Sequence, residues 1–70
     1  MSTRSYAIRF EFPEAVLYAG RADDALGFAP TLETALKFHY ALDAERTLKN
    51  GYGAESQSVA RVVVADAVAA

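Results

Sequence analysis

The sequence predicts a small α+β domain with the order β-β-α-β, in which a three-stranded antiparallel sheet carries one helix on one face. Three features support this fold class. Apolar and polar residues alternate in residues 5–12, a helix-favouring stretch occupies residues 31–50, and a run of β-branched residues follows in 58–66. The 70 residues are enough for one domain with a thin two-layer core. Its ends, residues 1–4 and 66–70, are expected to fray.

The first strand is predicted from "SYAIRFEF", residues 5–12, because strict alternation puts the large apolar side chains on one face. That face consists of Tyr6, Ile8, Phe10 and Phe12. Pro13 has no backbone N–H to donate, so the strand is expected to end there. "AVLYAG", residues 15–20, is then predicted to return as its hairpin partner.

Residues 21–27, "RADDALG", are predicted to form a surface loop, because they combine two acidic residues with a closing Gly27. Phe28 is expected to start a short extended piece before Pro30, since a proline disfavours helical backbone in the residue that precedes it.

A helix is predicted to begin at Thr31, a residue suited to an N-cap, and to end at Asn50 and Gly51. Its apolar residues do not keep to one face. One stripe contains Leu32, Ala35, Phe38 and Leu42, and a second, rotated stripe contains Ala41, Ala44 and Leu48. Two arrangements fit this change of direction: one continuous helix, or two shorter helices with a kink near residues 39–41. Residues 38–42 contain no helix breaker, so the continuous helix is favoured.

Beyond the helix, residues 51–57 are predicted to form a glycine-rich connection. "SVARVVVAD", residues 58–66, is rich in β-branched residues and predicts the last strand. Its consecutive valines indicate apolar neighbours on both faces.

Composition narrows the class of protein. The chain has no cysteine, which excludes disulfides and thiolate metal sites. No stretch approaches the roughly 20 apolar residues of a membrane span, and the N-terminal residues lack the apolar run of a signal peptide. Seven basic and nine acidic residues give a net charge of −2, which does not attract a phosphate backbone. We therefore expect a cytoplasmic protein that binds neither membranes nor nucleic acid directly.

The only histidine, His39, lies four residues before Asp43, a spacing that puts both on one face of a helix. Two ligands do not complete a metal site, and no turn motif presents a serine nucleophile to this histidine. Asp23 and Asp24 are adjacent and point apart on an extended loop, so they do not form a general acid and base pair. We therefore expect no enzyme activity, no catalytic residue, no metal and no cofactor, and we interpret His39 as hydrogen-bonding Asp43.

Some of the aromatic residues exceed what a thin core needs, namely Tyr18, Phe28, Tyr40 and Tyr52. Tyrosine and arginine are frequent at interface hot spots, which favours a protein-binding surface. In the alternative interpretation, each of these aromatic rings lies at the edge of the core, with any hydroxyl in water. The candidate partner-binding residues are Tyr18, Arg21, Asp23, Asp24, His39, Tyr40, Asp43 and Glu45.

The run "GFAPTLETALKFHYALDAERTL", with two strands before it and a valine-rich strand after it, resembles a pattern of small phage and prophage proteins. The matching residues are Tyr6 and Ile8, Tyr18 and Gly20, Gly27 and Phe28, Ala35 and Phe38, Ala44 and Glu45, and Val62 to Val64. Those proteins usually cap a second helix with a small hydroxyl residue. Tyr40 stands at that position here, which argues against two helices.

Small, acidic, cysteine-free phage proteins of this kind are similar to anti-CRISPR proteins, which bind a subunit of the host's RNA-guided surveillance complex. The resemblance implies a non-enzymatic inhibitor in the cytoplasm of the host bacterial cell. It would bind a subunit of a type I CRISPR surveillance complex and block target DNA binding, through DNA mimicry or a steric block. An acidic patch would face the basic DNA path. Its residues would be Asp23, Asp24, Asp43 and Glu45.

The chain is expected to be a monomer or a weak homodimer. The alternative function is a structural or regulatory phage protein that acts as a homodimer through the exposed edge of the last strand.

Overall fold

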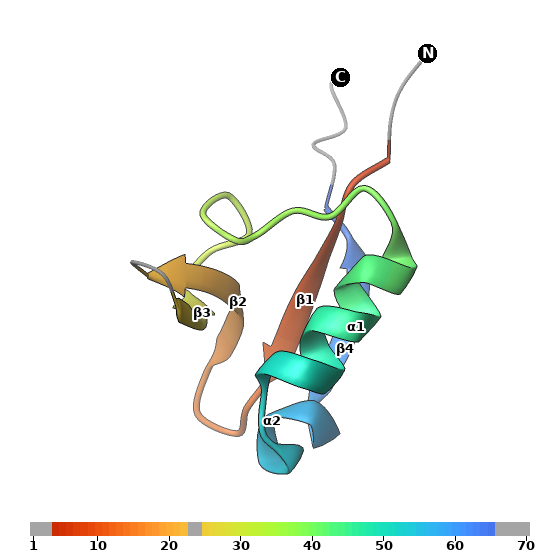
Figure 1. Cartoon of the computed structure of the whole chain (residues 1–70). Helices are drawn as coiled ribbons and strands as arrows, with labels where there is room; N and C mark the ends of the chain where they lie inside the picture. Colours follow the sequence, from red (N-terminus) through yellow and green to blue (C-terminus); the bar gives the residue numbers. More distant parts are fainter. Residues whose placement is uncertain (1–3, 23–24, 66–70) are drawn as a thin grey trace.

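The computed structural model describes residues 4–22 and 25–65. Its elements, in chain order, are β1 (Tyr6–Glu11), β2 (Val16–Ala22), β3 (Ala25–Ala29), α1 (Ala41–Gly51), α2 (Ala54–Ser58) and β4 (Ala60–Val64). The strands form one antiparallel sheet in the order β3-β2-β1-β4, and α1 crosses one face of it (Figure 1). The α+β class and the antiparallel sheet are confirmed, whereas the predicted three strands and one helix are too few. The predicted frayed residues 1–3 and 66–70 lie outside the described part of the chain.

The alternation predicted for the first strand is confirmed in β1. Its large apolar side chains enter the core between the sheet and α1, where Ile8 and Phe10 are completely buried. Ala44 of α1 is completely buried against them, and Leu48 packs beside it. The second apolar stripe of the predicted helix is therefore the one that faces the sheet.

The opposite face of the sheet has a smaller core. Its buried residues are Ala7, Ala29, Ala35 and Ala65. Tyr18, Leu32 and Val63 pack against them, so the segment after β3 covers this face where a second helix would otherwise lie. Val62 faces the α1 side while Val63 faces this side, which confirms that the valine strand has apolar neighbours on both faces.

The predicted surface loop at residues 21–27 is wrong, because most of it belongs to the β2–β3 hairpin. Gly20 pairs with Gly27 and Arg21 with Leu26 across the two strands. Small residues fill these strands, so the sequence shows little of the apolar alternation that indicates a strand. The extended piece expected at Phe28 is confirmed and is part of β3.

The predicted continuous helix is wrong over residues 31–40, and no helix forms there in place of its first half. The hydroxyl of Thr31 does accept a hydrogen bond from the backbone N–H of Thr34 (3.3 Å), as an N-cap does, but the chain leaves this turn after Ala35. The ammonium group of Lys37 then closes the turn by donating hydrogen bonds to backbone carbonyls. Its acceptors are the carbonyls of Leu32 (2.6 Å), Glu33 (3.3 Å) and Ala35 (3.0 Å).

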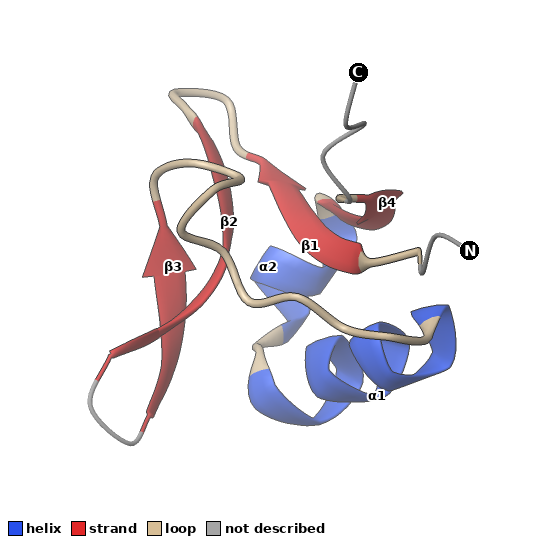
Figure 2. Ribbon diagram, turned by 90° about the horizontal axis from the view of Figure 1, so that it is seen from above, coloured by secondary structure: helices blue, strands red, loops and turns tan. Residues whose placement is uncertain are grey.

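Residues 36–38 instead insert between β1 and β2. The N–H of Leu36 donates to the carbonyl of Ala19 (2.9 Å) in β2, while Phe38 and Tyr6 of β1 exchange two backbone hydrogen bonds of 2.8 Å. Figures 1 and 2 show this segment running from the end of β3 across β1 to the start of α1. The register of β1 with β2 covers only Arg9 to Glu11, so this segment supplies the partner that the beginning of β1 lacks on that side.

The helix begins at Ala41, inside the region where the alternative arrangement placed a kink. Tyr40 is its N-cap, with extended backbone and no side-chain hydrogen bond to the first turn. The helix ends at Gly51, as predicted. The expected glycine-rich connection contains the short helix α2, and the Gln57 amide donates hydrogen bonds to the carbonyls of Lys49 (3.3 Å) and Tyr52 (2.7 Å). These bonds satisfy carbonyls at the open end of α1.

Neither helix of the described residues is long and apolar enough to cross a membrane.

Candidate protein-binding surface

Two of the surplus aromatic residues, Phe28 and Tyr52, belong to one aromatic cluster. Phe10, Phe12, Phe28 and Tyr52 form one cluster, with ring centroids 4.9 to 5.9 Å apart. The hydroxyl of Tyr52 donates a hydrogen bond to the carbonyl of Gly27 (2.6 Å) and so fastens β3 to the end of α1. Burial raises the pKa of Tyr52, and a hydrogen bond with the backbone of Gly20 opposes this shift in part. Tyr52 is thus a packing residue, whereas Phe28 contacts the cluster and still leaves 47% of its surface exposed.

The predicted binding residues on the β2–β3 side are Tyr18, Arg21, Asp23 and Asp24. Tyr18 is half-buried and packs against the alanine core on the face opposite α1. Arg21 is exposed, in the last part of β2. Asp23 and Asp24 lie outside the described residues.

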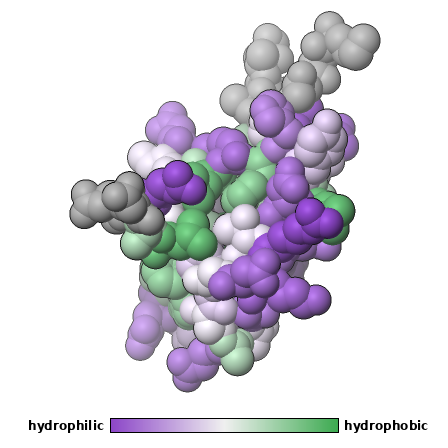
Figure 3. Space-filling view, viewed as in Figure 1, coloured by the Kyte–Doolittle hydropathy of each residue, from purple (hydrophilic) through white to green (hydrophobic). Residues whose placement is uncertain are grey.

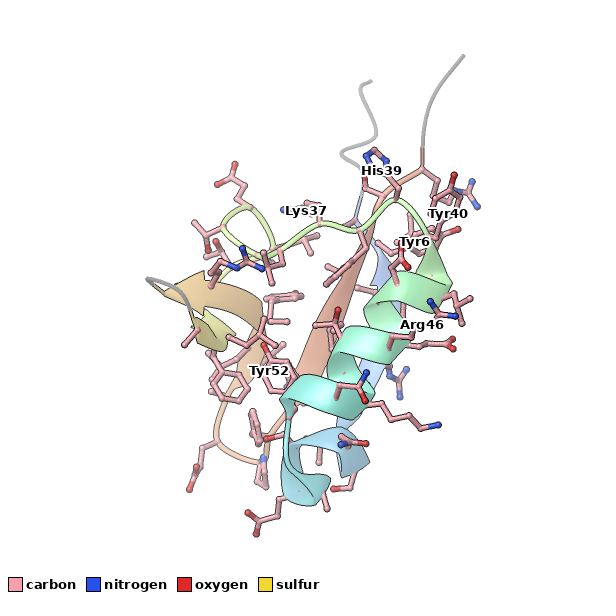
Figure 4. The ribbon with its side chains drawn as sticks, in the orientation of Figure 1. Tyr6, Lys37, His39, Tyr40, Arg46 and Tyr52 are labelled. Carbon is pink, nitrogen blue, oxygen red and sulfur yellow. The ribbon has the colours of Figure 1, made fainter. Side chains whose placement is uncertain are left out.

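His39 and Tyr40 lie next to each other in the turn that leads into α1 (Figure 4). Both are exposed, and Tyr40 has 69% of its surface open to solvent, the largest fraction among the exposed large hydrophobic residues of the described chain. Because α1 starts only at Ala41, the spacing of four residues does not put His39 and Asp43 on one helix face. None of the side-chain hydrogen bonds among the described residues joins these two, so the predicted pair is wrong.

Asp43 and Glu45 are exposed on α1, but they lie on different sides of it. Two residues of helix correspond to a rotation of about 200°. Glu45 lines a shallow groove together with two basic residues, Arg46 and Lys49. The described part of the chain therefore does not form the acidic patch expected around these two residues.

This groove marks a flank of α1 that the sequence analysis missed. It is lined by Leu42, Glu45, Arg46, Leu48, Lys49 and Gln57. Leu42 belongs to the first apolar stripe of the predicted helix, for which a position in the core is expected, yet 56% of its surface is exposed. The stripe of Ala41, Ala44 and Leu48, of which Ala44 is buried, indicates this position of Leu42. A helix that turns this stripe toward the sheet turns Leu42 about 100° away from Ala41.

The other flank of α1 faces β3. Leu26 lies against Gly51, and a second shallow pocket is lined by Leu26, Arg46, Thr47, Asn50 and Gly51. In the space-filling view, hydrophobic residues gather beside the β2–β3 hairpin and hydrophilic residues cover α1 (Figure 3). Since β3 and β4 are the two ends of the sheet, the flank with Leu42, Glu45 and Lys49 lies toward β4.

On the opposite face of the sheet, two arginines share one glutamate. Arg9 Nε lies 3.2 Å and Arg61 Nε 3.8 Å from the same carboxylate oxygen of Glu11. The Arg9 contact is an ion pair without hydrogen-bond alignment. Within residues 4–22 and 25–65, no three His, Cys, Asp or Glu side chains converge in a way that could hold a metal ion.

No protein-family model matches this chain, and neither the curated proteins nor the solved structures contain a significant match.

Proposed function

We propose that the chain is a non-enzymatic protein-binding module, and that its binding surface is the N-terminal end of α1. The exposure of Tyr40 is the observation that supports this proposal most directly, because 69% of this aromatic residue is open to solvent where the chain enters α1. An exposed aromatic ring with exposed polar residues close to it in the chain, His39 before it and Asp43 in the first turn of α1, has the composition of an interface anchor with a polar rim.

The resemblance to phage proteins gives this proposal its specific form, an anti-CRISPR-type inhibitor that binds a subunit of a type I CRISPR surveillance complex. Its effect would be to prevent the complex from binding target DNA. The separation of Asp43 from Glu45 on α1 favours a steric block over mimicry of the DNA charge, since a mimic needs its carboxylates in a row on one surface.

Direct binding and DNA-binding measurements test this proposal. The purified, tagged chain is added to type I surveillance complexes. Capture through the tag measures whether the complex binds the chain, and a gel shift measures whether the complex still binds a labelled target duplex. We expect capture of the complex and loss of the DNA shift. If type I complexes neither bind the chain nor lose DNA binding, the inhibitor proposal is wrong.

A substitution at Tyr40 tests the surface itself. Tyr40→Ala is expected to weaken binding by about 2 kcal/mol or more, roughly thirtyfold in Kd, as removal of an interface anchor does. Val16→Ala is the control, because Val16 is also an exposed apolar residue, with 39% of its surface open, but lies on β2. Equal affinities for the two variants would exclude Tyr40 from the interface.

A further inference from the structure

The outer edge of β4 offers backbone hydrogen-bonding groups that the described residues leave without a partner. β4 is the last strand of the sheet and pairs on one side only, with β1. The N–H of Ala65 donates to the carbonyl of Ser5 (2.8 Å), and the N–H of Glu11 donates to the carbonyl of Val59 (2.9 Å). Antiparallel hydrogen bonds alternate along a strand, so Val59, Arg61, Val63 and Ala65 point their backbone groups at β1. Ala60, Val62 and Val64 point theirs outward.

This edge carries none of the usual features that prevent pairing with another strand. β4 contains no proline, and its one charged residue, Arg61, directs its backbone inward. Val64 lies at the edge with 52% of its surface exposed. The groove along α1 lies on the same side of the molecule, and its exposed Leu42 is a further apolar residue near this edge. An edge with free backbone groups and apolar flanks is suited to the addition of a strand.

We propose that a second copy of this chain occupies the edge, with the two β4 strands antiparallel about a two-fold axis at Val62. The dimer would then have a continuous eight-stranded sheet with both α1 helices on one face. Contacts of this kind are isologous and close after two subunits.

The sequence of β4 selects this register among the possible ones. With the axis at Val62, Ala60 faces Val64 of the second copy, and all three residues with outward groups find partners. With the axis at Arg61, two arginines would face each other directly, which is unfavourable. With the axis at Val63, Ala60 would find no partner within the described strand. Only the first register pairs every outward group without opposing like charges.

The charges along α1 are compatible with the same two-fold axis. The axis makes the two α1 helices antiparallel, and the flanks that face each other carry Glu45 and Lys49, which are opposite in sign. Leu42 and Val64 would lose part of their exposed surface in the dimer. Pairing through β4 is independent of the proposed CRISPR partner, because it uses the edge of the sheet and leaves Tyr40 at the N-terminal end of α1.

Sedimentation measurements on edge variants test the dimer. We expect wild type to sediment at twice the 7.5 kDa of one chain at concentrations in the upper part of a range of roughly 1 μM to 1 mM. Val64→Pro removes an outward N–H that the monomer does not use, and Val64→Lys adds a charge at the edge, so both variants are expected to sediment as monomers. Val16→Lys is the matched control, because it makes the same change at an exposed valine of β2 and is expected to leave the dimer intact.

A disulfide trap tests the register directly. The chain has no cysteine, so Val62→Cys provides one thiol per copy. Residues facing each other across a hydrogen-bonded pair have Cα atoms about 5.5 Å apart, within the range for a disulfide. Oxidation is expected to give a covalent dimer from Val62→Cys and none from Val16→Cys. Three results would overturn the proposal. They are a wild type that is monomeric throughout the concentration range, a dimer that persists in both Val64 variants, and equal cross-linking of the two cysteine variants. None of these results bears on the DNA-binding test of the inhibitor.

Discussion

Replacing Gly20 by alanine is expected to destabilise the fold, although the change adds only one methyl group. A Cβ at this position would lie 2.9 Å from the Cβ of Ala29 and 3.1 Å from its backbone nitrogen. Ala29 has only 5% of its surface exposed and Gly20 is buried, and neither side chain can rotate away. The two strands must therefore separate by a few tenths of an ångström. Overpacking of this kind costs about 1–3 kcal/mol of the free energy of unfolding.

Gly27 provides a matched control for this substitution. It is the direct cross-strand partner of Gly20, but a Cβ added to it would have no atom within 4 Å. Gly27→Ala is expected to be neutral, or to stabilise by about 0.4–1 kcal/mol because alanine restricts the unfolded chain more than glycine does. The two variants should therefore differ by about 1–4 kcal/mol, or roughly 4–32 °C in melting temperature for a domain of this size.

Urea unfolding followed by circular dichroism measures this difference. The free energy of unfolding in water and the slope with denaturant are compared for wild type, Gly20→Ala and Gly27→Ala. We expect equal slopes and a lower midpoint for Gly20→Ala alone. Equal stabilities for the two variants would refute the close approach of β2 and β3 at this position and, with it, the observed register of the hairpin.

Two further substitutions test single contacts. The folded-state pKa of Tyr52 is raised above 10.0, so the unfolded chain loses this proton first. The stability that this shift provides should be complete below pH 10 and lost as the pH rises through the folded-state pKa. Tyr52→Phe should flatten this part of the profile of stability against pH. A Tyr52→Phe profile identical to that of wild type would contradict the buried hydroxyl. Lys37→Met should lower the free energy of unfolding by about 1 kcal/mol through loss of its carbonyl hydrogen bonds, whereas Lys49→Met on the exposed face of α1 should have little effect. Equal urea midpoints for the two lysine variants would show that the Lys37 contacts contribute nothing.

The sequence by itself determined the elements whose pattern is strong and local. The alternation from Tyr6 to Phe12 predicted β1 and its buried face, and the valine run predicted β4. The stop at Asn50 and Gly51 predicted where α1 ends. For the candidate surface, the sequence singled out Tyr40 and His39, which the structure exposes. It gave the wrong side for Leu42, because the helix was assumed to begin ten residues too early.

Only the tertiary structure decided the conformation of residues 31–40. The local pattern favoured a helix, with an N-cap at Thr31 and apolar residues at helical spacing. In the folded chain β2 leaves β1 after a short pairing, and the backbone of β1 at Tyr6 requires another partner on that side. Phe38 supplies it, and the hydrogen bonds of Leu36 and Lys37 hold the extended segment in place. Unpaired backbone groups beside a core are more costly than the loss of nearly three turns of marginal helix, so the requirement of the sheet overrides the local preference.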